Sequence, residues 1–305
     1  YTLGKKYPHD RGLQAVLDTF LTAWEIEKKH ALHRAAILAP KTVVSINESL
    51  MLVMVDEFQY INNFTHREDV PTPVPLTGYY QTVVESFKCP HLLSGSAVRM
   101  MMYEVINGPL AGRFDFEFLE PLSSEDSKEL ISKLSITEDI EIGRAEKDLI
   151  AKRTGGHPYY IDCIVRRAKK LGIYTISREN LSDILAFEIT NVKGKINEFF
   201  REQLALYFKG EDLNVIKLIF LYATKFEEKQ VNQEAIAKAT GYSKELVYET
   251  LCKLADADLV EQRGMSFRTL KDEILREYIQ ATYESEIEGL DYNRVQENTR
   301  RRIGF

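Results

Sequence analysis

Cysteine, surplus positive charge and long apolar runs are all scarce in this chain, and each scarcity excludes a class of protein. Its three cysteines, Cys89, Cys163 and Cys252, lie far apart and form no C-x-x-C pair. Zinc ribbons and disulfide frameworks are therefore excluded, and a reducing, cytoplasmic location is expected. No apolar run reaches the roughly 18 residues that a membrane-spanning helix needs.

Basic residues are outnumbered, because 40 Lys and Arg face 46 Asp and Glu for a net charge of −6. A molecule that is basic overall is excluded, so any nucleic acid must bind to a local patch. A hydrophobic content of 44% supports a folded core. At roughly 150 residues per domain, the length predicts two or three domains. The chain opens at Tyr1 without a signal peptide, and we expect a cut edge of a longer protein.

Residues 1–121 are predicted to form an α/β domain. Apolar residues at helical spacing predict one long amphipathic helix over 13–38, with Trp24 in the core. A short strand is predicted over 89–93. Alternating phenylalanines predict a further strand over 114–118.

The strongest motif is the apolar run Leu50–Val55, which ends in Asp56 and Glu57. A run without alternation predicts a strand covered on both faces, as in the parallel sheet of an α/β domain. Ligands of such domains bind at the carboxyl ends of strands, where one acid could hold Mg²⁺ and the other address an attacking water. The alternative is a strand that simply runs into an acidic loop.

Two further signals are weaker. Ser94 and Ser96 follow the strand predicted over 89–93, and a hydroxyl there could sense a γ-phosphate. The alternative is a turn with a helix cap at Ser96. Arg113 precedes the last predicted strand and could clamp a phosphate, or it could form a surface salt bridge.

Residues 122–210 are predicted to form a helical lid that contains the sequence T-G-G-H-P. Gly156 would let the backbone approach a ligand closely, and Pro158 would open a helix whose positive end faces that ligand. His157 lies between them. The alternative is an ordinary corner between two helices with a C-cap glycine.

Residues 211–285 predict a winged helix, with helices before and after a turn at Gly241 and a two-stranded hairpin around Gly264. Acidic residues share its recognition helix, so docking of a protein is as plausible as binding of DNA. Residues 286–305 are predicted to be a charged tail. The candidate nucleic-acid contacts are Lys244, Tyr248, Arg263 and Arg268.

Four segments in order, VDEFQYI, HLLSGSAVRMM, GPLAGRFDFEFLEPLS and TGGHPYYI, followed by the winged helix, resemble the archaeal and bacterial AAA-type ATPases of the STAND group. The resemblance covers about residues 45–285. It implies a P-loop NTPase-like parallel sheet, a helical lid and a C-terminal winged helix, with ATP or ADP and Mg²⁺ as ligands. It further implies that Asp56 and Glu57 form the Walker B motif and that Ser96 is sensor 1.

The resemblance also implies that the G-x-P sequence Gly156-His157-Pro158 opens the lid and touches the nucleotide. One departure is serious, because the chain contains no Walker A loop, G-x-x-x-x-G-K-[ST], whose amides would cradle phosphates. Gly4-Lys5-Lys6 is the nearest sequence. Either the loop lies outside these residues, which we expect, or the protein is a degenerate member that does not hydrolyse ATP.

We therefore expect an ATP-binding and hydrolysing switch ATPase, in which ATP lies between core and lid. Asp56 would hold Mg²⁺ through water, Glu57 would orient the attacking water, and Ser96 and Arg113 would read phosphate. His157 and Pro158 would link the nucleotide state to the lid and so reposition the winged helix. Nucleotide, DNA or protein, and further copies of the chain are the expected partners, without a membrane. The alternative is a non-catalytic DNA- or protein-binding winged-helix module on a degenerate ATPase core.

Overall fold

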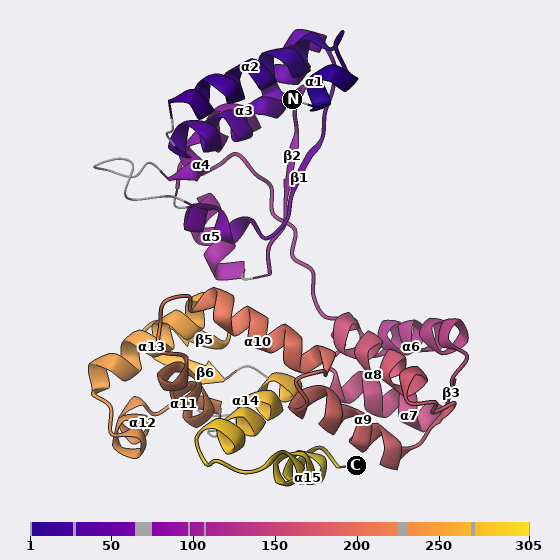
Figure 1. Ribbon diagram of the computed structural model, residues 1–305. Coiled ribbons are helices and arrows are strands. Elements are labelled where there is room, and N and C mark those ends of the chain that lie inside the picture. The colour runs from indigo at the N-terminus through magenta and orange to yellow at the C-terminus, as the bar shows by residue number, and fades with distance from the viewer. Residues whose placement is uncertain are drawn as a thin grey trace. The chain divides into compact units, whose positions relative to one another are not determined.

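The computed structural model describes residues 2–26, 29–64, 75–96, 98–106, 108–224, 231–269 and 272–304 (Figure 1). The chain divides into two compact units, Tyr1–Glu117 with Asp256–Asp258, and Phe118–Ala255 with Leu259–Phe305. The segments predicted as lid, winged helix and tail thus belong largely to one unit. Every helix in the described ranges is too short or too polar to cross a bilayer.

The described part of the first unit is mostly helical, with one pair of parallel strands. Strands β1 (Val53–Val55) and β2 (His91–Leu93) pair in register, with Val55 opposite Leu93. The other elements are α1 (Thr2–Lys6), α2 (Arg11–Glu25), α3 (Lys29–Asn47), the 3₁₀ helix η1 (Phe58–Phe64), α4 (Leu76–Val84) and α5 (Val98–Ile106).

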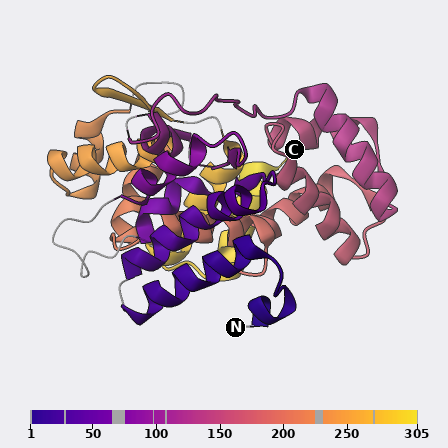
Figure 2. The ribbon, with the colours of Figure 1, turned by 90° about the horizontal axis from the view of Figure 1, so that it is seen from above.

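The single helix predicted over 13–38 is wrong, because α2 ends at Glu25 and α3 runs beside it (Figures 1 and 2). Each helix buries an apolar face against the other, and Gly12 allows a close approach to the backbone of α3. Trp24 lies outside this contact and is 71% exposed, so its predicted place in the core is also wrong.

The strand β1 is shorter than the predicted run, and its two faces differ. Val55 packs against a buried cluster that includes Phe58, Tyr80 and Val83. On the opposite face Met54 is 70% exposed, so the prediction of a strand covered on both faces is wrong for the described chain. No described element of this unit covers that face, whose other exposed apolar side chains are Leu50, Leu52 and Leu92.

The strand predicted over 114–118 is also wrong, since this stretch has no regular secondary structure. Phe114 packs against the core of the first unit, while Phe116 is exposed. A strand requires a neighbour for its backbone hydrogen bonds, and alternation of side chains does not supply one.

The second unit, over its described residues, is a helical assembly with two short strand pairs. Strands β3 (Glu141–Ile142) and β4 (Thr175–Ile176) are parallel, and β5 (Val260–Arg263) and β6 (Ser266–Thr269) form an antiparallel hairpin. The helices are α6 (Ser124–Glu138), α7 (Arg144–Arg153), α8 (Pro158–Lys170), α9 (Arg178–Thr190), α10 (Lys195–Tyr207), α11 (Leu213–Thr224), α12 (Gln233–Thr240), α13 (Lys244–Asp256), α14 (Glu273–Glu286) and α15 (Tyr292–Ile303).

Local signals set the boundaries of several of these helices. The Ser123 hydroxyl caps α6 at the amide of Asp126, 3.1 Å away, and Pro158 is the first residue of α8. The predicted hairpin turns at Gly264, whose φ of 61° is left-handed. The segment predicted as a charged tail contains α15, which buries Val295 and packs beside α9.

Candidate functional site

The two predicted acids lie directly after β1, beside the end of the parallel strand β2. The amide of Ser94 donates to the carbonyl of Val55 at 2.9 Å, and the amide of Phe58 donates back to the carbonyl of Ser94 at 2.9 Å. These bonds extend the pairing beyond the last strand residues. They hold the loop that starts at Asp56 against the loop that starts at Ser94.

Side-chain hydrogen bonds then join the residues that the sequence singled out. The Ser94 hydroxyl donates to Asp56 Oδ1 at 2.5 Å, and the amide of Glu57 donates to the same oxygen at 3.0 Å. The Ser96 hydroxyl donates to Glu57 Oε2 at 2.9 Å. The structure therefore brings Asp56, Glu57 and Ser96 into one cluster at the carboxyl ends of two strands.

Gln59 completes this cluster and was missed by the sequence analysis. Its Nε2 donates to Glu57 Oε2 and, at 3.3 Å, to the Ser96 hydroxyl. The side chain is 3% exposed, and its Oε1 has no hydrogen-bond partner in the described part of the chain. A Cβ on Gly95 would lie 2.2 Å from that oxygen, so glycine is required there for Gln59 to keep its position.

Glu57 has a backbone conformation that costs free energy. Its φ is 53°, in the left-handed region that non-glycine residues rarely adopt. The hydrogen bond from its backbone amide to the Asp56 carboxylate holds it there, together with the contacts that its side chain makes with Gln59 and Ser96. Strain of this kind concentrates at functional sites, where surrounding contacts fix a side chain in one direction.

The acids fit Mg²⁺ of the kind that accompanies a nucleotide. Asp56 is exposed, and its Oδ2 accepts no hydrogen bond from the described residues. Across those same ranges, no group of three or more His, Cys, Asp or Glu side chains could hold a metal ion alone. Mg²⁺ at nucleotide sites commonly takes only one or two carboxylates, with phosphate and water as its other ligands.

Arg113 forms a surface salt bridge, which was the alternative to a phosphate clamp in the sequence analysis. Its guanidinium forms an ion pair with Glu85 at 2.9 Å and donates to the carbonyls of Pro109 and Ala111, each at 3.1 Å. A role in reading phosphate stays a prediction, and it would require the guanidinium to leave Glu85.

The Gly156-His157-Pro158 corner lies in the second unit, between α7 and α8. Gly156 has a φ of 77°, and a Cβ there would lie 2.1 Å from the carbonyl oxygen of Leu122. The ring of His157 stacks on Tyr160 with 4.1 Å between centroids. Burial lowers the pKa of His157, although the carboxylate of Asp272 opposes the shift. The corner therefore has a fixed backbone and an imidazole that favours its neutral form.

The candidate nucleic-acid contacts are largely engaged within the protein. Lys244 forms an ion pair with Glu234 at 2.7 Å, and Arg263 forms one with Glu261 at 2.6 Å. The ring of Tyr248 packs edge-on against Phe267 in the hairpin. Arg268 is exposed.

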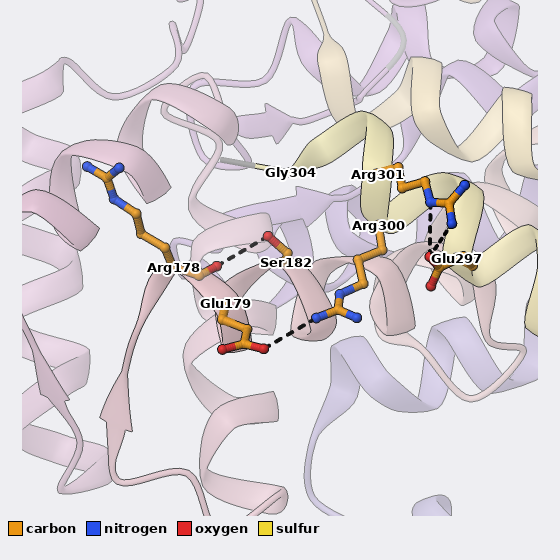
Figure 3. Close-up of a pocket in the computed structure, with 7 residues that line it drawn as sticks. All are labelled: Arg178, Glu179, Ser182, Glu297, Arg300, Arg301 and Gly304. Atoms are coloured by element: carbon orange, nitrogen blue, oxygen red, sulfur yellow. Dashed lines mark hydrogen bonds and ion pairs between the residues drawn. The ribbon is translucent and has the colours of Figure 1, made fainter.

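A cavity of about 400 Å³ opens between α9 and α15 in the second unit (Figure 3). Arg300 and Arg301 line it, but each is paired with a glutamate, Glu179 and Glu297 respectively, and Arg178 points away from both. The lining contains none of the residues predicted from the sequence. Two of its three arginines are paired with acids of the same unit and the third points away, so the cavity offers no concentrated site for phosphate.

Comparison with known proteins gives a fold but no family. No protein-family model matches the chain, and no curated protein matches it in sequence. A Walker-type ATPase of Pyrococcus abyssi matches in structure with a TM-score of 0.57 and 15% identity, over 81% of this chain and 67% of that one. The chain therefore shares the fold of a Walker-type, P-loop ATPase.

Two other solved structures match at TM-scores below 0.5. RuvB, the Holliday junction branch migration motor of Thermotoga maritima, matches with a TM-score of 0.38 and 15% identity, over 86% of this chain and 92% of that one. The DNA clamp loader delta protein of Bacillus subtilis matches with a TM-score of 0.22 and 13% identity, over 94% and 99% of the two chains.

Proposed function

We propose that this chain belongs to an AAA-type, STAND-like switch ATPase that binds and hydrolyses ATP. One observation carries the proposal: Asp56 and Glu57 at the end of β1 are hydrogen-bonded to Ser94 and Ser96 at the end of the adjacent parallel strand. The carboxyl ends of parallel strands are where α/β proteins bind their ligands. The fold shared with a Walker-type ATPase supports the same conclusion.

Each side chain of the cluster has a role suited to its chemistry. Asp56 would hold Mg²⁺ through water with the oxygen that Ser94 leaves free. Glu57 would orient the attacking water and accept its proton, with its carboxylate held by Gln59 and Ser96. Mg²⁺ would neutralise charge on the phosphates. Ser96 and Arg113 would respond to the γ-phosphate.

ATP binding also requires a phosphate-binding loop, and the proposal is conditional on one outside these 305 residues. A strand, loop and helix that carry such a loop would present amides to the phosphates. They would also supply an apolar surface for the bare face of β1 and β2, where Met54 and Leu92 are exposed. The exposed face supports this condition without identifying the segment.

The second unit would convert the nucleotide state into movement. Gly156, His157 and Pro158 would contact the nucleotide and open or close the helices that follow. The three helices α11, α12 and α13 and the hairpin β5–β6 follow the element order of a winged helix, which supports assigning them as the module that moves.

The test is ATP turnover by the full-length protein beside its Glu57→Gln variant. Loss of a general base costs about 10²- to 10⁴-fold in rate. We therefore expect turnover to fall by about that factor while ATP binding persists. Glu25→Gln, an exposed position at the end of α2, is the matched control and should turn over ATP normally. Equal turnover by both variants would remove Glu57 from the reaction.

The missing Walker A sequence favours a second candidate, a non-catalytic docking module on a degenerate core. Failure of the full-length protein to bind ATP would support it. The ion pairs at Lys244 and Arg263 leave few cations for phosphates, which favours a protein partner over DNA. In a salt titration of DNA binding, log K falls with log salt by about 0.9 for each phosphate contact, so a flat result would exclude DNA.

A further inference from the structure

The backbone of the Gly156-His157-Pro158 corner is tied to the segment that leads into α6. The amide of Leu122 donates to the carbonyl of Gly156 at 3.0 Å, and the tight contact at the Gly156 Cα leaves no room for a side chain. His157 stacks on Tyr160, one turn into α8, with an angle of 18° between the rings. A shift of the segment at Leu122 would therefore be passed to Tyr160.

Tyr160 in turn is hydrogen-bonded to Asp272, the N-cap residue of α14. Its hydroxyl donates to Asp272 Oδ2 at 2.9 Å, and the other oxygen of this carboxylate caps α14 at the amide of Leu275, also 2.9 Å away. Tyr160 is almost fully buried, and this burial, followed by the carboxylate of Asp272, raises the pKa of the hydroxyl. The hydroxyl stays protonated and donates at any physiological pH.

A second bond attaches the next residue of α14 to a different helix. Arg153, the last residue of α7, forms an ion pair with Glu273 at 2.7 Å. Neighbouring helix residues project about 100° apart, given 3.6 residues per turn. Bonds at Asp272 and Glu273 to two separate helices therefore fix both the position and the rotation of the first turn of α14.

An aromatic contact continues along the same path. The ring of Tyr160 lies 5.9 Å from that of Phe200 on α10, and Phe200 lies 5.1 Å from Tyr278 on α14. The hairpin strand β6 ends at Thr269 and α14 begins at Glu273, so the hairpin and the helix are close neighbours in the chain.

We propose that Tyr160, Asp272, Arg153 and Glu273 form a clamp that positions the hairpin and α14 according to the state of the Gly156-His157-Pro158 corner. These are positioning residues, because they act through α14 and touch no substrate. The inference rests on the proposed function only for the claim that a nucleotide moves the corner.

Hydrogen exchange of the full chain without nucleotide tests the clamp through Tyr160→Phe, which removes one hydroxyl and keeps the ring. A hydrogen bond to a charged group is worth about a 10- to 150-fold change in an equilibrium constant. We expect exchange to rise by about that factor over 260–269 and the first turn of α14. Tyr159→Phe is the matched control, since Tyr159 donates to the carbonyl of Lys195 on α10 instead. The same pattern from both variants, or no change over 260–280 in Tyr160→Phe, would overturn the clamp.

Swapping the charges of Arg153 and Glu273 gives a result that general destabilisation would not produce. Arg153→Glu and Glu273→Arg should each raise exchange over 260–269, and the double variant should recover most of the protection. Additive losses in the double variant would contradict the proposal. Because neither experiment uses ATP, a failed clamp leaves the Glu57 experiment intact, and absent ATP turnover leaves the clamp intact.

Discussion

His157 is held where its charged form is disfavoured. Its Nδ1 is buried without a partner among the described residues, and burial lowers its pKa below the ordinary value of 6.5 against the opposing carboxylate of Asp272. The folded state therefore binds fewer protons than the unfolded state. The free energy of unfolding should be unaffected by this group above about pH 6.5, and should fall as the pH drops through the lower folded pKa.

The His157→Phe variant tests this expectation, because it keeps a ring against Tyr160 and removes the titration. In the unmodified protein, hydrogen exchange of the α8 amides should rise at acidic pH by more than its intrinsic pH dependence. The variant should lose this additional rise. His91→Phe is the control, since burial also lowers the pKa of His91 but in the first unit. An acid-dependent rise in α8 that survives His157→Phe would contradict the assignment.

For single residues, the sequence predicts which side chains follow neighbouring strands. It does not predict which side chains a turn brings into the same cluster. Asp56 and Ser96 each follow a predicted strand, and parallel strands end at one edge of a sheet, so both were expected at that edge. Gln59 was not expected, since its place depends on the left-handed backbone of Glu57, which turns the chain back. The available signal was a polar residue between the aromatic neighbours Phe58 and Tyr60, both buried.

The helix α10 depends on a residue from another element for its start. Its N-cap is Gly194, which has no side chain to offer. Glu188 of α9 takes that role, because its Oε2 accepts from the amides of Lys195 at 2.5 Å and Ile196 at 3.3 Å. Its other oxygen accepts from Arg167 of α8. One carboxylate, 1% exposed, therefore joins three helices.

Replacing Glu188 by Ala should be costly, because it removes a cap and leaves Arg167 without its partner in a site where that side chain is only 13% exposed. Breaking a buried pair costs about 3–5 kcal/mol of unfolding free energy. Glu198→Ala removes an exposed, solvent-screened partner of Lys195 and should cost far less. Urea denaturation of the two variants measures the difference, and equal losses would refute this role for Glu188.

Helix boundaries were predictable where the signal is local. Ser123 and Pro158 mark the starts of α6 and α8 by chemistry that acts within one turn. The stretch 13–38 failed because its break is set by packing of α2 on α3. The alternating stretch 114–118 failed because a strand depends on a distant partner. The cap from Glu188 was likewise not predictable from a local signal, since it joins residues on separate helices.

For the molecule as a whole, the bare face of β1 and β2 is the feature that most needs an explanation. Parallel strands are ordinarily covered on both faces. Here Val55 and Leu93 pack on the core while Met54 and Leu92 stand opposite each other in register and exposed. In the proposed function, the acids that follow β1 act beside a phosphate-binding loop. A single segment that carries such a loop would satisfy both requirements.

If such a segment covers the face, the same substitutions should have different costs in two lengths of the protein. In the 305-residue chain, the double change of Met54 and Leu92 to Thr should alter the unfolding free energy by less than about 0.5 kcal/mol for each exposed position. In a full-length protein with a covering segment, each change should cost about 1–3 kcal/mol. Val55→Thr, on the core side of β1, is the control and should cost as much in either length. A full-length protein that tolerates the double change as well as the short chain would show that nothing covers this face, and the conditional phosphate-binding loop would lose its structural support.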